Sequence, residues 1–165
     1  MNEDNSILFT QLYNRYSQQI TRLCLGYTGN TALAQDLAQE TFIHVWQGLH
    51  RFRGDAQHST WIYRIAVNTC LSHLRSPKNK TPQQLPETIK TIAEENDTKE
   101  QDIQLLYKCI STLQETDRLI ISMVLEDIPY KDIAESTGIS EGNLRVKIHR
   151  IKQQLSEKFN SHEEF

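Results

Sequence analysis

The sequence of 165 residues predicts an all-α protein built from two small helical domains joined by a flexible linker. Apolar residues recur at steps of three and four along most of the chain. No segment alternates with a period of two, so strands are not expected. Between the helical segments, residues 76–102 contain Pro77, Pro82 and Pro86 among many Gln, Thr, Asn and Glu residues, which is typical of a linker.

The first domain, residues 5–75, is expected to be a bundle of three helices. Its first helix has apolar residues from Phe9 to Tyr27, and glycines are common where a helix ends. The expected limits are Gly26 and Gly29 at the end of the first helix, residues 33–49 for the second, and about 60–74 for the third, with Ser59 or Thr60 as its N-cap.

The second domain, residues 103–159, is expected to contain four helices. Pro129 precedes the third of them, Gly138 suits a left-handed C-cap, and Ser140 can cap the helix that follows. The expected helices are residues 103–113, a segment around 119–124 capped by Thr116 or Asp117, residues 130–137, and a last helix with the apolar stripe Leu144, Ile148, Ile151 and Leu155.

The last two helical patterns form a helix-turn-helix with a basic second helix. That helix carries Arg145, Lys147, Arg150 and Lys152, although the whole chain has a formal net charge of −3. Cationic charge concentrated on one helix of an acidic protein suits the major groove of DNA. The alternative is an amphipathic helix with a solvated basic face.

A carboxylate-bearing face lies on the second helix of the first domain. Asp36, Gln39, Glu40 and Ile43 fall near one side of this helix, and Asp36 and Glu40 form an i, i+4 pair. Such a pair can dock Arg and Lys side chains of a partner. A solvated face, or a weak metal or acid–base site, are the alternatives.

Basic and aromatic residues are mixed in and before the third helix. Basic charges attract phosphates and aromatic rings stack on exposed bases, so this mixture suits single-stranded DNA. Core packing is the alternative for Phe52 and Trp61. The residues concerned are Arg51, Phe52, Arg53, His58 and Trp61 before and at the start of the helix, and Arg64, Asn68, Leu71 and Arg75 along it.

Several functional classes find no support in the sequence. It contains no phosphate loop, nucleophile elbow, paired metal motif or dinucleotide fingerprint, so we expect no catalysis, cofactor or metal. The N-terminus lacks a signal peptide and no apolar run approaches a membrane span, so we expect a cytoplasmic protein without membrane insertion. Cys24, Cys70 and Cys109 are expected to be reduced, mostly buried thiols.

Two segments together resemble an extracytoplasmic-function (ECF) sigma factor, a small bacterial member of the sigma-70 family. DLAQETFIHVWQGLHRFRGDAQHSTWIYRIAVNTCLSHLR, residues 36–75, is similar to region 2 of that family, and LQETDRLIISMVLEDIPYKDIAESTGISEGNLRVKIHRIKQQL, residues 113–155, is similar to region 4. The resemblance implies an RNA polymerase sigma factor that directs promoter-specific transcription initiation. It also implies an anti-sigma factor as a further partner.

The resemblance assigns three sets of residues. The clamp helices of the core polymerase would contact Asp36, Gln39, Glu40, Phe42, Ile43 and Trp46. The melted −10 strand would contact Arg51, Phe52, Arg53, His58, Trp61, Tyr63, Arg64, Val67, Asn68, Leu71 and Arg75. The −35 duplex would contact Ser140, Asn143, Arg145, Val146, Lys147, His149 and Arg150, in a domain that also docks on the polymerase flap.

The linker then has a mechanical role, because the two promoter elements lie about 70 Å apart, at ~34–36 Å per helical turn. A relaxed coil of this length falls short of that span, so we expect the linker to be stretched through the bound polymerase.

The competing hypotheses are a helix-turn-helix regulator with an N-terminal sensing or partner-binding domain, and an enzyme built on Asp36 and Glu40.

Overall fold

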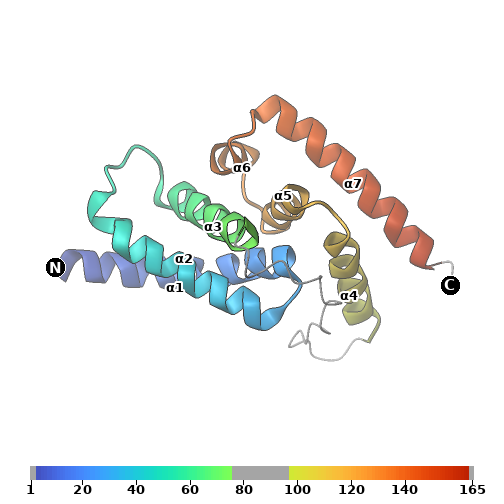
Figure 1. Cartoon of the computed structure of the whole chain (residues 1–165), viewed down its shortest axis with the longest axis horizontal. Coiled ribbons are helices and arrows are strands. Elements are labelled where there is room, and N and C mark those ends of the chain that lie inside the picture. The colour runs from blue at the N-terminus through green and yellow to red at the C-terminus, as the bar shows by residue number, and fades with distance from the viewer. Residues whose placement is uncertain (1–2, 76–96, 164–165) are drawn as a thin grey trace.

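The computed structural model describes residues 3–75 and 97–163, and within these ranges every regular element is a helix (Figure 1). The all-α prediction is therefore confirmed. None of the described helices is both long and apolar enough to cross a membrane. The elements are α1 (Glu3–Thr28), α2 (Thr31–Gly48), the 3-10 helix η1 (Leu49–Arg51), α3 (His58–Arg75), α4 (Asp97–Ser111), α5 (Glu115–Leu125), α6 (Tyr130–Thr137) and α7 (Glu141–Glu163).

The first unit consists of α1, α2 and α3, as expected. Gly29 has a φ of 67°, in the left-handed region that favours glycine, and it reverses the chain after α1. Asn30 then caps α2, because its side-chain oxygen accepts a hydrogen bond of 2.9 Å from the backbone N–H of Leu33. The prediction for Gly26 was wrong, since Gly26 lies buried inside α1.

The starts of α3 and α5 differ from the predicted caps. α3 begins at His58 after Gln57, whose carbonyl accepts the first helical hydrogen bond, so the cap expected at Ser59 or Thr60 was wrong. α5 likewise begins after Gln114, two or three residues before the expected cap at Thr116 or Asp117, and the Gln114 carbonyl accepts the first helical hydrogen bond from the backbone N–H of Arg118.

α4 begins at Asp97, so residues 97–102, which we assigned to the linker, are helical. Lys99, Glu100 and Gln101 have good helix propensity, which the composition of the longer segment obscured. The remainder of the expected linker, residues 76–96, and its predicted extension lie outside the described residues.

The second unit consists of α4 to α7, and its helix-turn-helix matches the prediction. α6 ends at Gly138, whose φ of 75° lies in the left-handed region. The Ser140 hydroxyl accepts a hydrogen bond of 3.3 Å from the backbone N–H of Asn143 and so caps α7. The apolar stripe of α7 is buried as predicted: Leu144, Ile148, Ile151 and Leu155.

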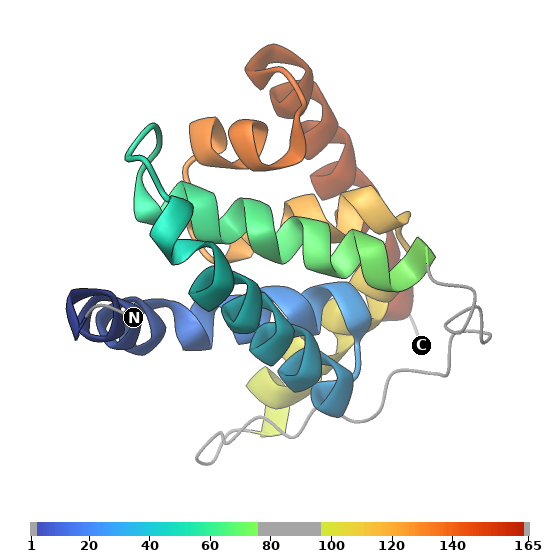
Figure 2. The same cartoon turned by 60° about the vertical axis from the view of Figure 1, so that its left-hand side comes forward.

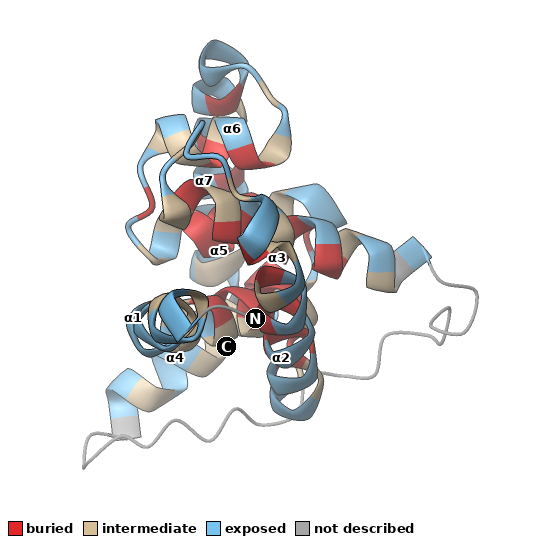
Figure 3. Cartoon of the chain, turned by 90° about the vertical axis from the view of Figure 1, so that its left-hand side faces the viewer, coloured by how far each residue is buried: buried red, intermediate tan, exposed pale blue. Residues whose placement is uncertain are grey.

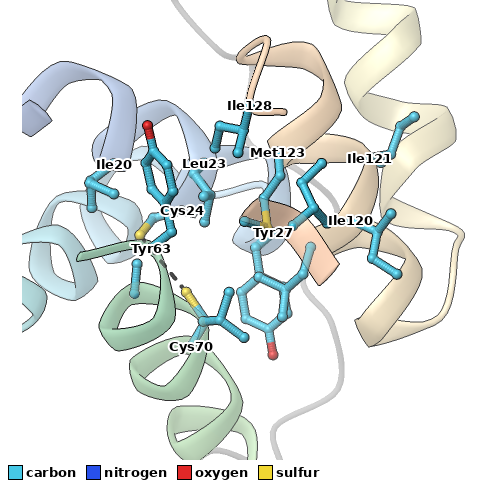
Figure 4. Close-up of a cluster of buried hydrophobic side chains, with 14 of the residues drawn as sticks. Ile20, Leu23, Cys24, Tyr27, Tyr63, Cys70, Ile120, Ile121, Met123 and Ile128 are labelled. Atoms are coloured by element: carbon cyan, nitrogen blue, oxygen red, sulfur yellow. Dashed lines mark hydrogen bonds between the residues drawn. The ribbon is translucent and has the colours of Figure 1, made fainter. Parts of the chain in front are cut away.

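The two units pack directly against each other, which the sequence left open. α1 lies against α5 and α4, and α3 lies against α6 (Figures 1 and 2). Buried residues concentrate where α1, α3 and α5 meet (Figure 3). A single apolar cluster therefore includes residues of both units, as the close-up of Figure 4 shows.

All three cysteines are buried free thiols, so the expected burial is confirmed. The sulfurs of Cys24 in α1 and Cys70 in α3 lie 3.8 Å apart, within the core of the first unit (Figure 4). The hydrogen bond to Cys24 and burial both raise the pKa of the Cys70 thiol. Cys70 therefore stays protonated and contributes to packing like a small apolar residue.

Gly26 allows an unusually close approach between α1 and α5. A Cβ atom at this position would lie 2.1 Å from the Ser122 Oγ and 2.9 Å from its Cβ. The Ser122 Oγ could rotate away, but its Cβ is fixed to the backbone, so one helix would have to move. The glycine is therefore required by the contact between the units.

We expect Gly26→Ala to lower the free energy of unfolding by about 1–3 kcal/mol through overpacking. This loss exceeds the roughly 1 kcal/mol that alanine gains over glycine inside a helix. Urea unfolding followed by circular dichroism measures the change. The matched control is Gly142→Ala in α7, where a Cβ would meet nothing within 4 Å, and it should not destabilise the protein. Equal effects of the two substitutions would contradict the prediction.

Candidate nucleic-acid and partner interfaces

The helix-turn-helix presents the outer face of α7 to solvent. The buried Ile133 of α6 and the buried Leu144 and Ile148 of α7 are on the inner sides of the two helices. Holding one helix across another in this way projects the second helix outward, as major-groove recognition requires. Of the seven predicted duplex-contacting residues, Lys147 is half-buried. The other six are exposed: Ser140, Asn143, Arg145, Val146, His149 and Arg150.

Two basic side chains on this face form ion pairs with acidic residues of the same chain. Lys147 Nζ lies 3.0 Å from Asp117 Oδ1, which ties α7 to α5. Arg145 pairs with Glu141 at 3.2 Å, and its guanidinium lies 5.5 Å from the centre of the Tyr130 ring. Exposed pairs such as Arg145–Glu141 are worth little in water. Arg145 is therefore available to exchange Glu141 for a DNA group.

The loop before α3 holds a stack of aromatic rings. Phe52 stacks on His58, with ring centroids 4.4 Å apart, and lies 5.0 Å from the ring of Trp61. Trp61 packs over Gly48, where a Cβ would lie 3.1 Å from the indole. Phe52, His58 and Trp61 are all half-buried, so they combine packing with an accessible ring surface. Arg51 and Arg53 are exposed beside them.

The predicted strand-contacting face of α3 is divided by burial. Arg64, Asn68 and Arg75 are exposed and Leu71 is half-buried. Tyr63 and Val67 are only 5% and 2% exposed. The Tyr63 hydroxyl donates a hydrogen bond of 2.8 Å to Gln19 of α1. Burial, with smaller contributions from Tyr16 and Asp132, raises the pKa of Tyr63 to about 12.

The predicted polymerase-facing side of α2 is mostly exposed. Asp36, Gln39 and Glu40 are exposed, and Ile43 is an exposed large apolar residue at 55%. Trp46 is half-buried, whereas Phe42 is only 4% exposed. An exposed apolar residue and an accessible aromatic ring with polar groups around them are typical of a surface that binds another protein.

Sequence reasoning missed the contribution of α1 to this surface. Tyr13 is 44% exposed and lies 5.0 Å from the Phe42 ring, and Phe9 lies 5.1 Å from the Trp46 ring. Both residues fit the apolar pattern of α1, and that pattern does not distinguish a core residue from one at the edge of an exposed patch. Among the described residues, no group of three or more His, Cys, Asp or Glu side chains is placed to hold a metal ion.

Comparison with known proteins agrees with this division into two units. The sigma-70 region 2 model matches residues 12–80, and the sigma-70 region 4 model matches residues 103–155. An ECF RNA polymerase sigma-E factor of Haemophilus influenzae is 29% identical, over 91% of this chain and 86% of the relative. The RNA polymerase sigma-H factor of Pseudomonas aeruginosa is also 29% identical, over 89% of this chain and 83% of the relative.

Two solved structures share the fold. The sigma factor RpoE of Bartonella quintana, in complex with the anti-sigma factor NepR, has a TM-score of 0.77 and 18% identity, over 92% of this chain and 96% of that one. CnrH, in complex with the cytosolic domain of CnrY, has a TM-score of 0.71 and 18% identity, over 93% of this chain and 88% of that one.

Two helical units, one of them with an exposed basic recognition helix, define a DNA-binding protein of the all-α class. The family matches make the identification specific. The chain belongs to the sigma-70 family, within its ECF group, and is an RNA polymerase sigma factor. Its family consists of transcription initiation factors.

Proposed function

We propose that three separate surfaces of this sigma factor divide the work of promoter-specific initiation. The face of α2 binds the clamp helices of core RNA polymerase, α3 and the loop before it hold the melted −10 strand, and α7 reads the −35 element as duplex. The observation that carries the proposal is the exposed outer face of the recognition helix α7, which carries Arg145, Lys147, Arg150 and Lys152. The same chain has an exposed acidic and apolar face on α2.

The chemistry of α7 supports duplex recognition. Arg145 can donate two hydrogen bonds to the edge of a guanine, and Asn143 can pair with adenine. Lys147 and Arg150 can contact phosphates and release counterions, so binding would weaken as salt rises. The same unit would dock on the polymerase flap.

The chemistry of the first unit supports single-strand binding. Arg51, Arg53 and Arg64 are exposed cations beside the half-buried rings of Phe52 and Trp61. Phosphates of an opened strand would meet the cations, while unstacked bases would find ring surfaces. The protein would supply no catalysis of its own, because opening DNA requires only that the separated bases be trapped.

An anti-sigma factor is the remaining proposed partner. One similar solved structure is the sigma factor RpoE in complex with the anti-sigma factor NepR, and the other is CnrH in complex with the cytosolic domain of CnrY. We place the protein in the bacterial cytoplasm, where polymerase and promoter DNA are found. Domain limits of 5–75 for the first domain and an end at residue 159 for the second remain part of the proposal, whereas the second domain now begins with α4 at Asp97.

In vitro transcription tests the proposal as a whole. The purified chain is mixed with core polymerase and a promoter library, and the start sites are sequenced. The expected result is a set of promoters that share two elements separated by a constant spacing. Failure to associate with core polymerase, or start sites that do not depend on the added chain, would overturn the proposal.

We expect Arg145→Ala to weaken promoter use by an amount that depends on the upstream sequence. Losing a bidentate contact to guanine costs about 1–3 kcal/mol of discrimination, so promoters with the preferred base should lose most. The measurement is the same library transcription, compared promoter by promoter. Lys152→Ala is the matched control, because it removes an exposed cation of α7 outside the proposed set. A uniform loss across all upstream sequences would show a phosphate contact instead.

A further inference from the structure

One cation of the recognition helix α7 is turned toward the rest of the protein. Lys147 lies three positions after the buried Leu144 and four positions before the buried Ile151. Residues at these spacings lie on the same side of a helix, so Lys147 stands at the edge of the outer face, next to the buried stripe. Its Nζ lies 3.0 Å from Oδ1 of Asp117 in α5, and α7 packs on α5 (Figure 1).

The carboxylate of Asp117 is largely closed to solvent. Its side chain is 16% exposed, against 38% for that of Lys147. The Oδ1 atom itself is buried and accepts no hydrogen bond, because the Lys147 ammonium is close enough for an ion pair but not directed for a hydrogen bond. Without the ammonium, a buried carboxylate oxygen would have neither a cation nor a donor, which is costly. A DNA phosphate must therefore compete with Asp117 for Lys147.

The ion pair of Arg145 on the same helix differs in exposure. Arg145 pairs with Glu141 at 3.2 Å, and the two side chains are 63% and 49% exposed. A pair of this kind adds little stability in water, and water solvates the Glu141 carboxylate when Arg145 leaves it. Arg145 can therefore turn to DNA at little cost, whereas Lys147 would leave a buried oxygen behind.

The number of cations that reach phosphates determines how α7 binds duplex of any sequence. Each phosphate contact adds about 0.9 to the slope of log K against log salt, and such contacts supply nearly all of non-specific binding. A genome offers roughly 10⁶–10⁹ non-specific sites that compete with promoters. A recognition helix that keeps one cation away from phosphates therefore binds bulk DNA more weakly. It keeps its contacts to base edges, which carry the sequence information.

We propose that Asp117 is a positioning residue that holds Lys147 away from the DNA backbone and so limits the affinity of α7 for duplex. The inference rests on the proposed function, because it concerns how tightly α7 binds DNA. It gives Lys147 a smaller share of duplex binding than its charge suggests. Removing the Asp117 charge should release Lys147 to a phosphate, and duplex binding should then become both tighter and more dependent on salt.

Salt-dependent titration of the full-length chain measures this release. The probe is a fluorescently labelled duplex of about 25 base pairs and mixed sequence, followed by anisotropy between about 50 and 200 mM KCl. Asp117→Asn should bind roughly five- to tenfold more tightly at about 50 mM KCl, with a slope steeper by about 0.9. Lys147→Met alone should change the affinity less than about twofold. Adding Lys147→Met to Asp117→Asn should abolish the gain, because the released cation is then missing.

The matched control is Glu135→Gln, which removes the same charge from an exposed position of α6 that forms no ion pair with any described residue. Its slope should equal that of the wild type. Unchanged affinity and slope for Asp117→Asn would overturn the inference, while duplex binding by α7 would stand. A slope shallower by about 0.9 for Lys147→Met alone would overturn it too, because Lys147 would already contact a phosphate. A gain that persists without Lys147 would show relief of general charge repulsion instead.

Amine labelling tests the ion pair in the absence of DNA. Under reductive methylation read by peptide mass spectrometry, Lys147 should react at least about threefold more slowly than the exposed Lys152 of the same helix. In Asp117→Asn the two rates should become similar. Equal rates in the wild type would overturn the inference without any DNA measurement. If neither the wild type nor any variant binds duplex, the proposed role of α7 fails, and the labelling still reports whether Asp117 holds Lys147.

Discussion

Replacing Arg118 with alanine is expected to lower the free energy of unfolding by about 3 kcal/mol, because hydrogen bonds from a charged donor contribute roughly 1.5–3 kcal/mol each. Arg118 is only 5% exposed. Its Nε donates a hydrogen bond of 3.0 Å to the carbonyl of Tyr27, and its Nη1 donates one of 2.8 Å to the carbonyl of Leu113. The first of these carbonyls lies in the last turn of α1, where helical partners are missing. The alanine variant leaves both carbonyls buried without this donor.

Urea unfolding followed by circular dichroism measures this loss, and two variants separate its causes. Arg118→Met keeps much of the volume but removes both hydrogen bonds, so it should remain strongly destabilised. Arg118→Lys keeps the charge but cannot present the same planar set of donors, so it should lie between the wild type and alanine. Stability of Arg118→Met equal to that of the wild type would show that packing, and not hydrogen bonding, accounts for the effect.

The position of Arg118 illustrates what the sequence could predict and what it could not. Local signals identified the helix-turn-helix correctly, because Pro129, Gly138 and Ser140 each act on their own backbone. Arg118 instead contacts a carbonyl 91 residues earlier in the chain. No local pattern marks such a contact, and an arginine in a helix is most often a surface residue.

The contact between the two units escaped prediction for a related reason. Leu23 in α1 and Met123 in α5 fit the apolar spacing of their helices whether their own unit or the other one covers them. Gly26 fits a helix end as well as a close helix crossing, and the structure shows the second. Spacing identifies which face is buried but not against which partner.

The same limit applies to the candidate site on α3. Its exposed cations, Arg64 and Arg75, follow from the spacing of polar residues. Tyr63 and Val67 lie at the border between the polar face and the core stripe. Tyr63 contacts α1, where its hydroxyl donates to Gln19 and its ring meets that of Tyr16. The sequence therefore predicts which polar groups of α3 are exposed, but it does not predict how far Tyr63 and Val67 are buried.

Removing both carboxylates of the α2 face, with Asp36→Ala and Glu40→Ala in one chain, is expected to weaken binding to core polymerase by about 2–4 kcal/mol. This corresponds to roughly a 30- to 700-fold increase in Kd. Both side chains are exposed and lie one helical turn apart, beside the exposed Ile43. Truncating one member of a charge pair that becomes buried on binding typically costs 2 kcal/mol or more. Fluorescence titration of the labelled full-length chain with core polymerase measures the change.

The matched control removes two other exposed carboxylates, with Asp102→Ala in α4 and Glu157→Ala in α7. The net charge of the control equals that of the test variant, so a general electrostatic effect would appear in both. Binding of duplex DNA by α7 should be the same in the wild type and in the α2 variant, because Asp36 and Glu40 lie on the other unit. Equal polymerase affinity of the two variants would show that the carboxylates of α2 form a solvated face, and that polymerase binds elsewhere on the chain.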